Sequence, residues 1–387
     1  MRLAERMGRL GSESAFEVLA RARALEAQGR DVIHLEIGEP DFGTPDHVVE
    51  AGREALAAGW THYGPAAGDP ELRAAVAVRT NNLRGTSYVP EQVIVTPGAK
   101  PVMFFTMLAL VEAGDEVICP DPGFPIYRSM IDFAGATAVP IPLREQHAFG
   151  LDVDELERLI TPRTRLLIVN TPGNPTGGVI PPGDLERIAA LAVRHDLWVL
   201  SDEIYGELVF DGEHASLASF PGMAERTILL DGFSKTFAMT GWRLGYGIVP
   251  VGLVEPFTKL MVNSVSCASV AVQRAGLAAL TGPREEVIAM REAFRRRRDL
   301  VVGGLNAIPR LSCSRPAGAF YVFPNISATG LSSAAFAGGL LQEQGVATIA
   351  GTSFGAHGEG YIRLSTANSD ENLLRAVDRI ADYVSTV

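Results

Sequence analysis

The middle of the chain alternates short runs rich in β-branched residues with longer helical patterns. The strand-like runs lie at residues 93–96, 116–118, 166–170, 197–201 and 228–230. The helical patterns that separate them lie at residues 100–113, 126–133 and 184–194. Buried strands that are joined through helices pair in parallel and need helices on both faces. The alternation therefore predicts an α/β fold, with a mostly parallel sheet between helices, over residues 45–285.

A different pattern follows this region. Its elements are helices at residues 285–306 and 332–345, short strands at 346–349 and 361–364, and a last helix from about Asp370. This order predicts a smaller α+β domain over residues 286–387. Upstream, Asp69 followed by Pro70 is a typical helix start, with an N-cap carboxylate and a proline at the first helical position.

The size and charge of the chain exclude some classes of function. With 387 residues and 47% hydrophobic content, the chain can bury a large core and is expected to hold more than one domain. Its net charge of −11 argues against nucleic-acid binding. The one basic run, Arg295–Arg298, lies in a helical stretch and is interpreted as a solvated face. The seven histidines show no metal-ligand spacing, so no metal site is predicted.

Cysteine content and hydropathy bear on the location of the protein. The three cysteines are too few and too scattered for a disulfide framework, which fits a reducing cytoplasm. The first residues contain no long apolar run, so we expect no signal peptide. No stretch approaches the ~20 apolar residues of a membrane-spanning helix. We therefore expect a cytoplasmic protein that has no membrane partner.

The segment SKTFAMTGWRLG, residues 234–245, places a lysine and an arginine at a fixed spacing. The amine of Lys235 can condense with an aldehyde, and the guanidinium of Arg243 can pair with a phosphate. Pyridoxal phosphate is the cofactor that carries both groups. Because short motifs also match by chance, a surface lysine and a solvated arginine are the alternative.

Further candidate residues follow the predicted strands, where open α/β sheets bind their ligands. Gly98, Ala99 and Lys100 come after a strand and open a helix, whose positive end can hold a phosphate. The alternative for these three residues is an ordinary strand-to-helix turn. Asp202 and Tyr205 lie at the end of another strand, where a helix N-cap and a core tyrosine are the alternatives.

With NTPGNPTG at residues 170–177, these segments occur in the order of a known family. The chain resembles the class I and II aminotransferases, which have fold type I among pyridoxal-phosphate (PLP) enzymes, and is similar to bacterial aspartate aminotransferase-like members. The resemblance spans the chain from Gly38 to Arg363. It therefore bears on the domains, on the cofactor and on the substrate.

The resemblance implies how the domains are arranged. Residues 45–285 would form the large PLP-binding domain, and residues 286–387 would form the small C-terminal domain. The N-terminal segment, residues 1–44, would pack with the small domain through a helix over residues 16–28.

At the cofactor, the resemblance implies that Lys235 forms the covalent link and then acts as general base and acid. Asp202 would keep the pyridine nitrogen protonated, so that the ring accepts the electron pair released at the substrate Cα. Asn174 and Tyr205 would hydrogen-bond the phenolic oxygen. Phe124 would stack on the ring, and a plain core phenylalanine is the alternative for this residue.

At the phosphate, the resemblance implies contacts from Ser234, from Arg243 and from the turn at residues 98–100. Many relatives have a second serine where this chain has Gly232, so one hydroxyl contact is absent. Tyr63 matches a tyrosine that reaches the phosphate of the partner subunit. The resemblance therefore implies a homodimer with shared active sites.

At the substrate, the resemblance implies that Arg363 binds the α-carboxylate through two parallel hydrogen bonds. An edge-strand surface arginine is the alternative for this residue. Gly38 and Asn174 would meet the same carboxylate. Lys100 would contact the distal carboxylate of an acidic substrate, and a solvent-exposed lysine is its alternative.

We therefore predict a PLP-dependent aminotransferase that moves an amino group from an amino acid, with aspartate or glutamate favoured, to a 2-oxo acid such as 2-oxoglutarate. Neutral or aromatic donors are the alternative, because Phe124 and nearby apolar residues suit them. A β-eliminating C–S lyase remains a rival, because it shares the same electron sink. The acidic charge disfavours a PLP-sensing transcription regulator, and the intact Lys235, Asp202 and Arg363 disfavour an inactive scaffold.

Overall fold

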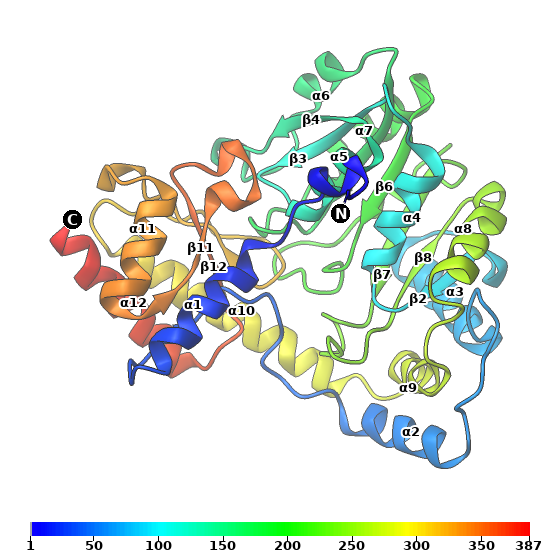
Figure 1. Cartoon of the computed structure of the whole chain (residues 1–387), viewed down its shortest axis with the longest axis horizontal. Helices are drawn as coiled ribbons and strands as arrows, with labels where there is room; N and C mark the ends of the chain where they lie inside the picture. The colour runs from blue at the N-terminus through cyan, green and yellow to red at the C-terminus, as the bar shows by residue number, and fades with distance from the viewer. Residues whose placement is uncertain (1) are drawn as a thin grey trace.

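The computed structural model describes residues 2–387 and contains a large sheet with two small ones beside it (Figure 1). The large sheet has the strand order β2-β8-β7-β6-β5-β3-β4. Its strands are β2 (Val93–Thr96), β3 (Glu116–Asp121), β4 (Thr137–Pro142), β5 (Thr164–Asn170), β6 (Trp198–Asp202), β7 (Thr227–Gly232) and β8 (Gly245–Ile248). Strand β8 is antiparallel to both of its neighbours, and the other neighbouring strands are parallel. The predicted α/β fold with a mostly parallel sheet is confirmed.

Helices cover both faces of this sheet. They are α2 (Asp46–Ala57), α3 (Pro70–Arg84), α4 (Lys100–Leu110), α5 (Pro125–Ala134), α6 (Val153–Leu159), α7 (Pro182–Arg194), α8 (Val251–Ser264) and α9 (Val270–Thr281). Strand β5 shows why both faces are covered. Leu166 and Ile168 belong to one hydrophobic cluster, and Leu167 and Val169 belong to another. Because successive side chains of a strand point to opposite faces, a strand that is apolar throughout must be buried on both.

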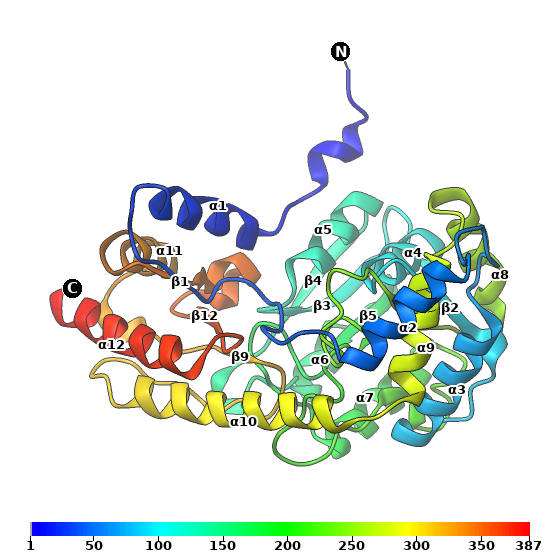
Figure 2. The same cartoon turned by 90° about the horizontal axis from the view of Figure 1, so that it is seen from below.

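A smaller group of elements lies beside the large sheet (Figure 2). It comprises β1 (Ile33–His34), β9 (Tyr321–Val322), β10 (Val346–Ala347), β11 (Ile349–Ala350), β12 (Ile362–Ser365), α1 (Ser14–Glu26), α10 (Glu285–Asn306), α11 (Ser333–Gly339) and α12 (Asp370–Thr386). Helix α10 joins the two groups. Its residues Met290 and Phe294 belong to a cluster of the large sheet, whereas Val301 and Leu305 belong to the cluster of the smaller group.

The N-terminal helix α1 packs on the smaller group. Its residues Ala22 and Leu25 contact Leu341 and Ala347. Strand β1, which follows α1, pairs in parallel with β10. The assignment of residues 1–44 to a segment that packs with a small domain, and the domain boundaries after residues 44 and 285, stay predictions.

Local sequence signals located most of these elements within a few residues. The predicted helix start at Asp69 is confirmed, because its carboxylate accepts the backbone N–H groups of Glu71 and Leu72 at 2.9 and 3.1 Å. The short helices, which the sequence did not predict, are η1 (Glu5–Arg9), η2 (Pro90–Gln92), η3 (Glu145–His147), η4 (Leu217–Ser219), η5 (Ser327–Thr329), η7 (Gly351–Phe354) and η8 (Ala356–Gly358).

Two predicted elements after residue 330 differ from the structure. The helix predicted at residues 332–345 is α11 followed by a π-helical turn, η6 (Leu340–Gln344), which ends at Gly345 with φ 66°. The strand predicted at residues 346–349 is divided between β10 and β11, which belong to different sheets. A run of apolar residues shows that a segment is buried, but it does not show which partner strand each residue pairs with.

The basic run on α10, interpreted from the sequence as a solvated face over residues 295–298, is solvated only at Arg295 and Arg296. Arg297 and Arg298 are only 7% and 1% exposed. Arg297 bonds Asp41 at 2.8 Å, and Arg298 bonds Asp211 at 2.5 Å. The carboxylates that neutralise these two guanidinium groups come from distant parts of the chain, so the run itself does not reveal them.

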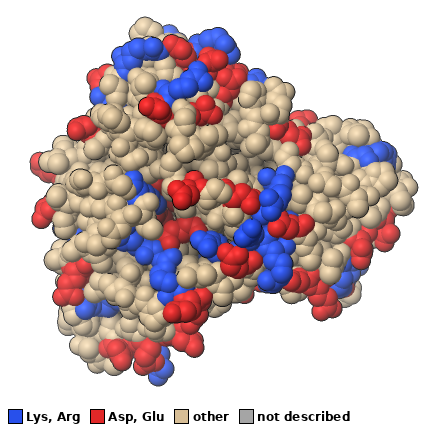
Figure 3. Space-filling model, turned by 180° about the vertical axis from the view of Figure 1, so that it is seen from behind, with Lys and Arg blue, Asp and Glu red and all other residues tan. Residues whose placement is uncertain are grey.

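Charged side chains of both signs are interspersed on the face seen in Figure 3. Among residues 2–387, the helices are too short or too polar for any of them to span a membrane.

The burial of Arg298 predicts a large effect on stability. We expect Arg298→Ala to lower the free energy of unfolding by about 3 kcal/mol, because the change leaves buried polar partners, including the Pro316 carbonyl, without their donor. The exposed Arg295 on the same helix provides the control, and Arg295→Ala is expected to change stability by less than about 0.5 kcal/mol. Urea unfolding of both variants checks this. Equal effects of the two substitutions would contradict it.

Candidate active site

A cavity of ≈ 380 Å³ lies where the carboxyl ends of β5, β6 and β7 meet the start of α4. Most of the residues predicted from the sequence line it: Gly38, Ala99, Lys100, Phe124, Asn174, Asp202, Tyr205, Ser234, Lys235, Arg243 and Arg363. Gly98 and Tyr63 are the predicted residues that do not line it. The chain has three lysines, and two of them, Lys100 and Lys235, face this cavity.

Lys235 follows β7 by three residues and extends into the cavity. Its Nζ donates a hydrogen bond to the backbone carbonyl of Gly38 at 2.5 Å. Burial lowers the pKa of the Lys235 amine to about 8, and the nearby Arg363 guanidinium adds to this effect, while Glu39 opposes it. A larger share of the amine is therefore neutral and nucleophilic near neutral pH than in an exposed lysine.

Asp202 is the last residue of β6 and is buried. Its carboxylate accepts hydrogen bonds from the Tyr127 hydroxyl at 2.6 Å and from the backbone N–H of Ile204 at 3.2 Å. Burial raises the pKa of Asp202 to about 6, because these two hydrogen bonds only partly stabilise the charge. Among residues 2–387 no cationic side chain pairs with Asp202, so the carboxylate suits a cationic group in the cavity.

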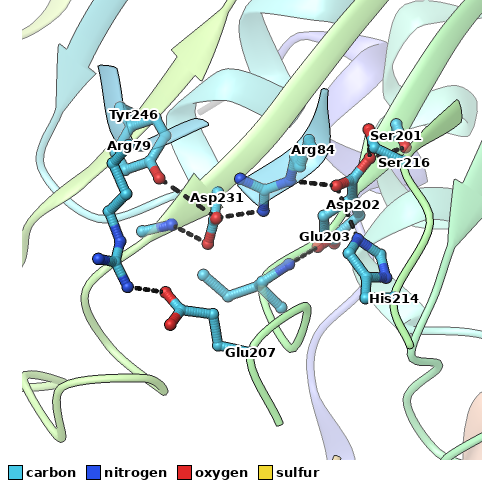
Figure 4. Close-up of polar contacts among 12 residues, drawn as sticks. Arg79, Arg84, Ser201, Asp202, Glu203, Glu207, His214, Ser216, Asp231 and Tyr246 are labelled. Atoms are coloured by element: carbon cyan, nitrogen blue, oxygen red, sulfur yellow. Dashed lines mark hydrogen bonds and ion pairs between the residues drawn. The ribbon is translucent and has the colours of Figure 1, made fainter. Parts of the chain in front are cut away.

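A buried polar network lies next to Asp202 (Figure 4). Arg84, the last residue of α3, bonds Glu203 through Nε and Asp231 through Nη2, both at 2.5 Å. The hydroxyl of Ser216 donates to Glu203 at 2.6 Å, and His214 Nε2 lies 2.8 Å from the same carboxylate. Burial alone would raise the pKa of Glu203, but Arg84 and His214 outweigh it and lower the pKa to about 2.

This network fixes the ends of two strands. Glu203 follows β6, and Asp231 lies in β7, so Arg84 ties both strands to α3. In addition, Asn170 Nδ2 donates to the carbonyl oxygen of Asp202 at 3.1 Å, which ties β5 to β6. The backbone that carries Asp202 is therefore held from both sides.

Arg363 lies in β12 with its guanidinium buried between two aromatic rings, 4.5 Å from the Tyr321 centroid and 5.0 Å from the Phe354 centroid. Its Nη1 donates to Asn174 Oδ1 at 3.1 Å, and its Nη2 donates to the Glu36 carbonyl. Its Nε is buried and has no hydrogen-bond partner among the described residues. A buried donor without a partner is costly, so this arrangement favours binding of an anion such as a carboxylate.

Tyr205 and Tyr321 both line the cavity, and their hydroxyl oxygens lie 2.8 Å apart. Burial raises the pKa of both phenols, so both stay protonated and can donate hydrogen bonds. Tyr321 and Tyr127 line the cavity but were not predicted from the sequence. Tyr321 lies in the short strand β9 and Tyr127 lies in the amphipathic helix α5, so the sequence indicates only ordinary core residues at both positions.

The turn before α4 brings Gly98 against Arg243. Gly98 has φ 79°, and a Cβ built on it would lie 2.3 Å from Arg243 Nη2, so no larger residue fits without displacing the arginine. Arg243 Nη1 donates to the Thr240 carbonyl at 2.8 Å. The guanidinium of Arg243, the Ser234 hydroxyl and the start of α4 therefore border the same end of the cavity, where an anion is favoured.

Lys100 and Phe124 form another part of the wall. The Lys100 ammonium donates to the Glu13 carboxylate and lies 5.5 Å from the centroid of the Phe124 ring. Phe124 packs edge-on against Tyr127 at 5.7 Å. Glu13 was not predicted as a site residue, because an isolated glutamate near the N-terminus gives no signal in the sequence.

Tyr63 is 89% exposed and lies outside the cavity of its own chain. It borders a separate hollow together with Trp60, Cys267 and Val270. Its position leaves it accessible to a second molecule, and its role stays a prediction.

Comparisons with known proteins show the family to which this chain belongs. The family model for aminotransferases of class I and II matches residues 30–380. The chain is 42% identical over 368 residues to the arginine–pyruvate transaminase of Pseudomonas aeruginosa, covering 95% of this chain and 94% of the relative. It is 44% identical over 355 residues to an aspartate aminotransferase of Pyrococcus abyssi, covering 91% of each. The solved structure of aspartate aminotransferase from Thermus thermophilus with maleate is similar, with a TM-score of 0.95, 42% identity and coverage of 99% and 100%.

The lowered pKa of Lys235 predicts how its reactivity depends on pH. The neutral amine attacks an aldehyde, and its fraction rises with pH through the pKa. We therefore expect adduct formation between the cofactor-free protein and pyridoxal phosphate to have its midpoint near pH 8, the pKa of this amine. Mass spectrometry of the borohydride-reduced adduct measures this at each pH.

The exposed Lys259 provides an internal control, because it lies outside the cavity and lacks the burial that acts on Lys235. Lys235→Ala should abolish the low-pH phase only. A single midpoint shared by all lysines would contradict the assignment.

Proposed function

The chain belongs to the class I and II aminotransferases and transfers amino groups between amino acids and 2-oxo acids, and from this premise we propose how its residues act. The observation that carries the proposal is that one cavity contains both a lysine amine whose pKa burial lowers to about 8 and a buried carboxylate that has no cationic partner among residues 2–387. Lys235 supplies the amine, and Asp202 supplies the carboxylate.

These residues fit pyridoxal phosphate, on which the family depends. Asp202 suits a protonated ring nitrogen, and Lys235 suits an aldehyde. Arg243, Ser234 and the turn at Gly98 suit a phosphate. When bound, pyridoxal phosphate supplies an electron sink for the pair released when the substrate Cα loses its proton.

Substrate binding and proton transfer are proposed for different side chains of the cavity. Arg363 holds the substrate α-carboxylate, because its unpartnered Nε and its position beside Asn174 offer donors in a fixed plane. Lys235 Nζ then removes the proton from the substrate Cα as a general base and returns a proton as a general acid. Tyr205 and Asn174 would orient the ring of the bound cofactor, and Phe124 would cover one side of it.

The substrate side chain is proposed to meet Lys100. The relatives differ here, since one is named for arginine and pyruvate and another for aspartate. Lys100 brings a positive charge to the wall of the cavity, which favours aspartate or glutamate as donor and 2-oxoglutarate or oxaloacetate as acceptor. Neutral or aromatic donors are the second candidate, because the apolar side chains of Ile37, Met103 and Phe124 line the same cavity.

We expect Lys100→Ala to reduce kcat/KM for aspartate or glutamate by about 10-fold, because one charged hydrogen bond is lost, and to leave alanine nearly unchanged. A panel of amino donors with 2-oxoglutarate as acceptor measures this. The exposed Lys259→Ala is the matched control. If neutral donors far outperform acidic ones and Lys100→Ala is unselective, the acidic preference is wrong and the transaminase remains.

Assembly and location are proposed as well. We propose a homodimer in which Tyr63 reaches the phosphate site of the other subunit. Its 89% exposure and the neighbouring exposed Leu56 and Trp60 support an interface there. The cysteines Cys119, Cys267 and Cys313 are free, which supports a cytoplasmic location.

The dimer proposal predicts the behaviour of Tyr63→Phe. We expect this variant to stay dimeric in light scattering and to bind pyridoxal phosphate about 10-fold more weakly, since a hydrogen bond to a charged group is lost. His62→Gln, which alters the exposed neighbouring residue, is the control and should bind normally. A fully active monomer would exclude this arrangement.

A further inference from the structure

We propose that Glu13 is an internal counter-ion that exchanges with the side-chain carboxylate of a dicarboxylic substrate at Lys100. With a neutral donor Glu13 stays on Lys100, and with a dicarboxylic substrate it leaves. This inference rests on the proposed role of the cavity in transamination and names the residue that lets one cavity accept both classes of substrate.

The Glu13–Lys100 pair lies at the cavity. Glu13 directly precedes α1, and Lys100 is the first residue of α4, so the pair joins segments 87 residues apart. Both side chains line the cavity that also contains Lys235 and Arg363. The pair is therefore part of the substrate site and not a surface contact elsewhere.

Both side chains of the pair are partly exposed to solvent. Lys100 is 47% exposed and Glu13 is 19% exposed, so water reaches the pair. Ion pairs that water reaches are weak. A substrate carboxylate can therefore replace Glu13 without the penalty of breaking a fully buried pair.

The Glu13 carboxylate has one side-chain partner within residues 2–387, the ammonium of Lys100. The backbone beside it is held, because Ala15 and Val18 pack against a buried cluster of aromatic and aliphatic side chains and α1 is anchored further at Ala22 and Leu25. The Glu13 side chain itself is partly exposed, so it can turn toward solvent by rotation about its own bonds when a second carboxylate arrives.

The exchange would let one cavity bind substrates whose side chains differ in charge. A transaminase binds its donor and its acceptor in turn at the same cavity, and the two can differ in side-chain charge. If Lys100 had no partner, a substrate with a neutral side chain would bind more weakly. Its side chain would displace water from the Lys100 ammonium without offering the ammonium a partner. Glu13 removes that penalty, at the cost of competing with acidic substrates for the ammonium.

Ligand binding to the holoenzyme tests this proposal. Succinate represents a dicarboxylic substrate, and 3-phenylpropionate represents a monocarboxylic one. We expect Glu13→Gln to bind succinate about 3- to 5-fold more tightly and to bind 3-phenylpropionate no more tightly than the unmodified protein. Glu17→Gln, which removes the same charge from an exposed position on α1, is the matched control and should change neither affinity.

A double-mutant cycle separates exchange from a purely structural role. In the Lys100→Met background, Glu13→Gln should no longer affect succinate binding. If Glu13→Gln changes the affinities for both ligands equally, or still acts without Lys100, the exchange is wrong. Absence of transamination with every donor would instead refute the proposed function, while the binding result would still decide the exchange.

Discussion

Arg84 holds together the two strands from which the catalytic chemistry is proposed to proceed. Its guanidinium bonds Glu203, next to Asp202 at the end of β6, and Asp231 in β7, three residues before Ser234. Because all three side chains are buried, removing Arg84 would leave two carboxylates without the guanidinium that neutralises them in a region that water does not reach. The spacing between Asp202 and Lys235 thus depends on an ion network that faces away from the cavity, and residues far from the substrate can govern its geometry.

Burial disfavours the charged form of both proposed catalytic groups, one of which is an acid and the other a base. It raises the pKa of Asp202 and lowers the pKa of Lys235, so each is held closer to its neutral form than in water. A ligand that brings a cation to Asp202 and an aldehyde to Lys235 relieves both. Such paired shifts in one cavity are typical of catalytic sites. In the same cavity, the Glu13–Lys100 pair is less buried and so is better suited to exchange than to catalysis.

The accuracy of the prediction from sequence varied with the range of the interactions involved. Lys235, Asn174 and Arg363 belong to compact motifs, and the structure places them in one cavity, although their roles await experiment. Glu13 and Tyr321 were missed, because each is a single residue of a common type with no local signature. Arg297 and Arg298 were misread for a related reason, since their acidic partners lie up to 256 residues away and the run resembles a solvated helix.

By itself, the sequence determined the α/β class, the mostly parallel sheet and the family, because hydrophobic periodicity and turn motifs act over a few residues and follow the chain. Only the tertiary structure decided that Arg84 meets Glu203 across 119 residues, that Lys100 is neutralised by Glu13, and that Arg363 retains a buried donor without a partner. These contacts arise when separate elements pack, and their strength depends on burial, which exists only once the chain has folded.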